Sequence, residues 1–137
     1  MIRVLVVEDS PTWAKMLTLL LESDGEIKVV GQAANGRQAV EMAADLRPDF
    51  ITMDVVMPDM DGLEATRRIM AAHPTPIVIV TAHENAPELN LVFNTIKAGA
   101  LEVISKGAVN GDDDAWKQEL LVKIKTLANV RPRKVGD

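Results

Sequence analysis

The sequence predicts an α/β domain in which helices cover both faces of a five-stranded parallel sheet. Five short apolar stretches, most of them rich in Val and Ile, suit strands that are buried on both faces. Five segments with apolar residues at helical spacing alternate with these stretches, as in a right-handed parallel α/β fold. The 137 residues, 47% of them hydrophobic, also match the size of one domain with a single core.

The predicted strands are the apolar stretches at residues 2–7, 27–30, 50–53, 77–80 and 101–104. The first helix is expected to follow Ser10, which can cap it with Pro11 at its first position. The second is expected at residues 36–47, because the following Pro48 disfavours helical backbone before it. The third is expected to begin after Asp61.

The fourth helix is expected to begin near Pro87 and to end at Gly99, because glycine is common just past a helix end. The fifth is expected to begin at the acidic run 112–114. Carboxylates at a helix start complement the helix dipole, so we interpret this run as a capping sequence rather than a metal site. We assign residues 1–130 to one domain and residues 131–137 to a basic tail or the start of a linker.

The composition excludes or disfavours several classes of function. The chain has no cysteine, so disulfides and thiolate metal sites are excluded. A net charge of −5 disfavours nucleic acid as a partner. No apolar run approaches the roughly 20 residues of a membrane span, and the first residues do not form a signal peptide. We therefore expect a cytoplasmic protein with no membrane partner.

Charged and hydroxyl side chains follow four of the predicted strands. Glu8 and Asp9 follow the first, Asp54 the third, Thr81 the fourth, and Ser105 and Lys106 the fifth. The carboxyl ends of parallel strands meet at one edge of the sheet, where functional groups of this fold class gather. Each residue alone would suit an ordinary turn, but together they predict a functional site.

If the first strand lies beside the third, Glu8 and Asp9 lie close to Asp54, and three such carboxylates repel one another. Either one of them keeps its proton or a cation enters. Oxygen ligands without His or Cys favour a hard ion, so we expect Mg²⁺, with Mn²⁺ possible. Thr81 and Lys106 would then contact a phosphoryl group. The predicted chemistry is in-line phosphoryl transfer to Asp54.

Four ordered blocks resemble the signature of the response-regulator receiver domain of two-component signalling. They are VLVVEDS at 4–10, MDVVMPDMDG at 53–62, IVIVTA at 77–82 and VISK at 103–106. The resemblance extends over residues 2–128 and implies a doubly wound, flavodoxin-like sheet with strand order 2-1-3-4-5. Within this family, the sequence is most similar to the receiver of chemotaxis methylesterases.

The resemblance also implies a role for each site residue. A sensor histidine kinase or phosphotransfer protein would phosphorylate Asp54, with Thr81 as the switch hydroxyl and Lys106 as the phosphate partner. The ligands of Mg²⁺ would be Asp9, Asp54 and the Val56 carbonyl, with Glu8 acting through water. The output would be a downstream protein or a linked output domain such as a methylesterase, with residues 89–97 on the partner face.

The sequence departs from the family pattern in several places. Gly107 replaces the usual proline after the lysine, so we expect a more mobile lysine loop. Val103 excludes an aromatic rotamer switch. The side chain of Val56 cannot orient water toward the acyl phosphate, and we interpret His83 as a residue of the hydrated rim. Trp13 is expected to pack in the core or at the rim rather than to contact the site.

Two other functions remain open from the sequence. The first is a hydrolase or phosphotransferase that acts on a separate substrate through Asp54, but Val56 stands where haloacid-dehalogenase-type phosphatases carry their second aspartate. The second is a binding module that works without phosphorylation. We favour the phosphorylated switch, which catalyses only its own phosphorylation and dephosphorylation and is therefore not an enzyme with a separate substrate.

Overall fold

A computed structural model describes residues 1–82, 86–106 and 114–130 of the chain. These residues form one parallel sheet with the strand order β2-β1-β3-β4-β5, which confirms the predicted doubly wound fold. The strands are β1 (Ile2–Val7), β2 (Ile27–Ala33), β3 (Phe50–Met53), β4 (Ile77–Thr81) and β5 (Glu102–Ser105). The helices are α1 (Pro11–Glu22), α2 (Gly36–Leu46), α3 (Gly62–Ala72), α4 (Ala86–Lys97) and α5 (Asp114–Leu127).

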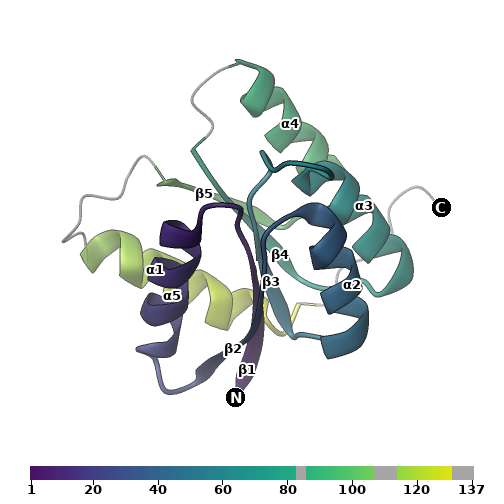
Figure 1. Cartoon of the computed structure of the whole chain (residues 1–137). Helices are drawn as coiled ribbons and strands as arrows, with labels where there is room; N and C mark the ends of the chain where they lie inside the picture. The colour runs from purple at the N-terminus through teal and green to yellow at the C-terminus, as the bar shows by residue number, and fades with distance from the viewer. Residues whose placement is uncertain (83–85, 107–113, 131–137) are drawn as a thin grey trace.

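Helices cover both faces of the sheet: α1 and α5 lie on one side, and α2, α3 and α4 lie on the other (Figure 1). Alternate residues of each central strand therefore enter different halves of the core. Phe50 packs with Leu17 and Leu120 on the α1–α5 side, whereas Ile51 packs with Ile69 on the other side. Because both faces are covered, β1, β3 and β4 are apolar along nearly their whole length.

Three strands differ from the predicted bounds: β4 ends one residue later, at Thr81, and both edge strands differ as well. β2 continues three residues beyond the predicted end, to Ala33, because its backbone stays paired with β1 through Gly31 and Gln32. β5 begins and ends one residue later than predicted, where its backbone pairs with β4. Backbone pairing at an edge does not require apolar side chains on both faces, so hydrophobicity alone does not locate these ends.

The helix starts follow the expected capping chemistry. Ser10 caps α1 by accepting a hydrogen bond from the Trp13 N–H at 3.3 Å, with Pro11 at the first helical position. Asp61 caps α3 by accepting from the Glu64 N–H at 2.9 Å. After α4, Gly99 adopts a φ of 128°, a left-handed conformation that favours glycine. Ser10 and Asp61 thus cap helix starts that follow the carboxyl ends of β1 and β3, whereas Gly99 ends α4 near the start of β4.

Several predicted features lie outside the described residues. They are the rim position of His83, the mobility of the loop at Gly107, the start of the acidic run at 112–113 and the tail at 131–137. Within the described residues α5 begins at Asp114, the last acid of that run. No helix among the residues that can be described is long and apolar enough to cross a membrane.

The loop between β3 and α3 folds back against the helix starts at two glycines. The Gly62 N–H donates to the Val55 carbonyl at 3.0 Å, and the Gly36 N–H donates to the Met60 carbonyl at 2.9 Å. A Cβ atom added at Gly62 would lie 2.4 Å from the Asp54 carbonyl oxygen and 2.7 Å from the Val55 Cα. These neighbours are backbone atoms, so the loop that carries Asp54 would have to shift.

We predict that Gly62→Ala lowers the free energy of unfolding by about 1–3 kcal/mol, the usual cost of overpacking a tight site. Urea denaturation of the native protein and the variant measures the difference. Gly25→Ala is the matched control, because nothing lies within 4 Å of a Cβ atom at that position. A Gly62→Ala protein as stable as the control would contradict the tight packing of this loop.

Candidate functional site

The sheet topology brings the predicted site residues to one edge. Val7 of β1 pairs with Met53 of β3, so the residues that follow these strands leave the sheet side by side. The Asp54 N–H continues this pairing by donating to the Val7 carbonyl at 3.0 Å. On the other side of β3, Thr81 ends β4 opposite Ser105 of β5. Lys106 follows directly, so all the predicted groups share the carboxyl edge.

Three carboxylates form a cluster at this edge. One oxygen from each of Glu8, Asp9 and Asp54 lies within 4.8 Å of the other two. Glu8 and Asp54 are 3% and 6% exposed, whereas Asp9 is exposed. The cluster confirms that these acids converge in space. Its donors are all carboxylate oxygens, which suits a hard divalent cation such as Mg²⁺.

Both carboxylate oxygens of Asp54 accept hydrogen bonds. Oδ1 accepts from the Thr81 hydroxyl at 3.2 Å and from the Val56 N–H at 3.3 Å. Oδ2 accepts from the Lys106 ammonium at 3.2 Å. Thr81 is buried, so its hydroxyl is held at the carboxylate rather than in solvent. These donors fix the orientation of Asp54.

Lys106 is the cation of the cluster. Its ammonium forms an ion pair with Glu8 as well as with Asp54, and its side chain is only 11% exposed. One ammonium faces three acids, so full ionisation leaves two negative charges uncompensated. Placing a divalent cation among these oxygens would restore neutrality. The charge balance of the site therefore favours binding of a divalent cation.

The pKa of Glu8 reflects the buried position of this carboxyl group in the cluster. Burial is the main influence that raises the pKa of Glu8 from its ordinary value of 4.5 to about 7, and the charge of Asp54 acts in the same direction. Hydrogen bonds from Lys106 and from the Ser10 N–H act in the opposite direction. In the metal-free protein, the carboxyl group of Glu8 therefore takes up a proton near neutral pH.

Trp13 corrects one prediction. The Lys106 Nζ atom lies 4.8 Å from the centroid of the Trp13 ring, so this residue contacts the site as well as packing against the core. Trp13 occupies the first turn of α1, close in sequence to Glu8 and Asp9. This sequence position could have indicated the contact with the site, whereas helical periodicity alone predicts only that the ring packs against the core.

Val56 lies at the rim of the site, with 45% of its surface exposed.

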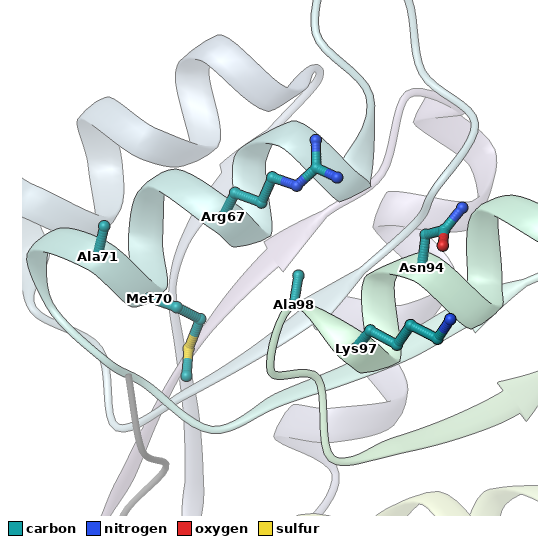
Figure 2. Close-up of a pocket in the computed structure, with 6 residues that line it drawn as sticks. All are labelled: Arg67, Met70, Ala71, Asn94, Lys97 and Ala98. Carbon is teal, nitrogen blue, oxygen red and sulfur yellow. The ribbon is translucent and has the colours of Figure 1, made fainter. Parts of the chain in front are cut away.

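A separate hollow of about 370 Å³ lies between α3 and α4, away from the carboxylates. Arg67, Met70 and Ala71 line it from α3, and Asn94, Lys97 and Ala98 line it from α4 and its end (Figure 2). None of the predicted site residues borders this hollow. The predicted site residues therefore lie apart from this hollow.

Comparisons with known proteins agree with this geometry. The family described as response regulator receiver domain matches residues 4–113. A protein-glutamate methylesterase/protein-glutamine glutaminase from Methanospirillum hungatei JF-1 is 44% identical over 133 residues, which cover 96% of this chain and 38% of that protein. The chain thus spans about two fifths of the length of the curated relatives that it matches.

Solved structures of receiver domains superpose on the chain. The response regulator domain of Thermotoga maritima CheB gives a TM-score of 0.82 with 36% identity, covering 96% of this chain and 99% of that one. A CheX-CheY-BeF3-Mg²⁺ complex from Borrelia burgdorferi gives a TM-score of 0.76 with 26% identity, covering 92% of this chain and 88% of that one. With this fold, this acidic cluster and these matches, the chain belongs to the response regulator receiver domain family.

Proposed function

We propose that this receiver domain is a phosphorylation-dependent switch whose phosphoacceptor is Asp54. The observation that supports this proposal best is the environment of the Asp54 carboxylate. A buried hydroxyl donates to one of its oxygens and a partly buried ammonium to the other, while two further acids lie beside it. An aspartyl nucleophile needs this combination of orienting donors and charge compensation.

In the proposed reaction, a carboxylate oxygen of Asp54 attacks the phosphorus of a phosphohistidine on the kinase or phosphotransfer protein. An O–P bond forms and the P–N bond breaks. The electron pair of that bond goes to the departing imidazole, which takes up a proton from solvent. Lys106 compensates negative charge on the transferred oxygens, and the Thr81 hydroxyl donates to one of them. Hydrolysis by water then returns the free carboxylate.

The oxygen cluster fits a divalent cation, which in this proposal is held by Asp9, Asp54 and the Val56 carbonyl, with Glu8 acting through water. Bound Mg²⁺ would supply charge neutralisation for the phosphoryl oxygens during transfer. The CheX-CheY complex of similar fold was solved with BeF3 and Mg²⁺, which supports a divalent cation in this proposal. Mn²⁺ has similar ligand preferences and is expected to substitute.

Partners and output are also part of the proposal. A histidine kinase or phosphotransfer protein is the expected donor, and a linked domain or a separate protein is the expected receiver of the signal. The methylesterase names of the relatives favour a linked output domain and a role in chemotaxis. On α4, Leu89, Phe93 and Ile96 are exposed apolar residues, which suits this helix as the partner face.

Phosphorylation would reach that face through Thr81 and the loop that leads to α4. Since Val103 cannot act as an aromatic switch, the signal is proposed to shift an existing equilibrium of this region. A hydrolase of separate substrates is less well supported, because the exposed Val56 side chain has no group that could act as a general acid. We therefore propose no separate substrate.

Phosphorylation is tested directly with a small-molecule phosphodonor. Incubation with acetyl phosphate and Mg²⁺ is expected to add one phosphate to the native protein and none to Asp54→Asn, as measured by intact mass. Asn has nearly the same shape but is not a nucleophilic carboxylate. A native protein that takes up no phosphate would exclude the proposed function, and modification of both proteins would place the phosphoacceptor elsewhere.

The lifetime of the acyl phosphate is expected to depend on Val56. Its exposed side chain cannot hold water by hydrogen bonding, whereas an amide at this position can. We predict that phospho-Asp54 decays faster in Val56→Asn than in the native protein, measured by loss of the added mass after the phosphodonor is removed. Val56→Leu is the control for side-chain size. Equal or slower decay in Val56→Asn would refute this role.

Glu8 is expected to make the stability of the metal-free protein depend on pH. Its folded pKa lies above its unfolded value, so its contribution to stability is complete below pH 4.5 and is lost as the pH rises through 7. In EDTA, the stability of the native protein relative to Glu8→Gln should fall by roughly 2–4 kcal/mol between pH 4.5 and 8. Urea denaturation measures both proteins, and a pH-independent difference would contradict the raised pKa.

A further inference from the structure

Lys106 has a contact that does not belong to the acidic cluster. Its ammonium lies 4.8 Å from the centroid of the Trp13 ring, within the range in which a cation is attracted to an aromatic face. The attraction is stronger for a desolvated cation, and the Lys106 side chain is only 11% exposed. The indole carries no net charge, so this attraction does not depend on the ionisation of Glu8 or Asp54.

The Trp13 ring is itself held by a second tryptophan. Trp116 of α5 packs against it edge to face, with ring centroids 6.2 Å apart and an interplanar angle of 64°. Trp116 is buried at 3% exposure in the core between the sheet and the α1–α5 layer. Trp13 is thus supported from the core rather than free to move with solvent.

Trp116 also fixes the backbone next to the lysine. Its indole Nε1–H donates to the Ser105 carbonyl at 2.8 Å, directly before Lys106 in the chain. The side chain of Lys106 contacts Trp13, Trp13 packs on Trp116, and Trp116 returns to the backbone at Ser105. The aromatic pair therefore links the side chain of Lys106 to the backbone directly before it.

We propose that Trp13 is a positioning residue for Lys106 in the phosphorylation of Asp54, with Trp116 as its support. The inference rests on the proposed function, because it concerns the lysine that compensates charge during phosphoryl transfer. Trp13 does not touch the transferred group. It holds the Lys106 ammonium beside the carboxylates, so that less conformational entropy is lost when the phosphoryl group is transferred.

The test compares phosphorylation rates by acetyl phosphate in Mg²⁺. Trp13→Leu removes the aromatic face but keeps an apolar side chain, and it should slow phosphorylation by roughly three- to thirtyfold. Trp13→Phe keeps an aromatic face that attracts a cation less strongly, so its phosphorylation rate should lie between those of Trp13→Leu and the native protein. Leu19→Ala, at an exposed position of the same helix, should react at the native rate.

A double-variant cycle separates positioning from a general structural role. In a Lys106→Ala background, Trp13→Leu should cause no further slowing, because the group that it positions is absent. Equal slowing in both backgrounds, or none in the native background, would overturn the proposal. If Trp13→Leu does not fold, Trp13→Met provides the same comparison. A native protein that takes up no phosphate would reject the proposed function itself, whereas normal phosphorylation of Trp13→Leu would reject only this inference.

Discussion

The pairing of the Lys106 ammonium with the buried carboxylates of Glu8 and Asp54 is the interaction on which this site depends. Carboxylates with so little exposure are costly to ionise unless a partner compensates their charge. The lysine provides that compensation for part of the acidic cluster, and Asp9 adds further negative charge at the exposed side. A site that holds more acid than base in this way is consistent with binding of a divalent cation.

The architecture of the sheet makes this charge arrangement possible. Neighbouring parallel strands end at the same edge, so β1 and β3 deliver their acids together, while β4 and β5 deliver a hydroxyl and an ammonium. The strands themselves are apolar and covered on both faces, which fixes their register in the core. The buried sheet therefore positions the reactive side chains at its carboxyl edge. The loop after Asp54 is held against the helix starts by close contacts at Gly36 and Gly62.

The central strands and the acidic cluster were predictable from sequence, because the patterns that predict them are local. Runs of Val and Ile located the central strands, and the residues directly after them identified Glu8, Asp9 and Asp54 as one group. The extension of β2 through Gly31 and Gln32 was not predictable, since edge pairing depends on backbone bonds. The contact between Lys106 and Trp13 was missed for a different reason: helical spacing shows which side of a helix faces inward but not which neighbour it meets.

The two tryptophans have one more consequence. They are the only tryptophans of the chain, which has no tyrosine. Light of long ultraviolet wavelength therefore excites only these two indoles, which pack together beside the acidic cluster. Their emission provides an intrinsic optical probe of the site, and changes in the ionic environment of Lys106 can be followed without attaching a dye.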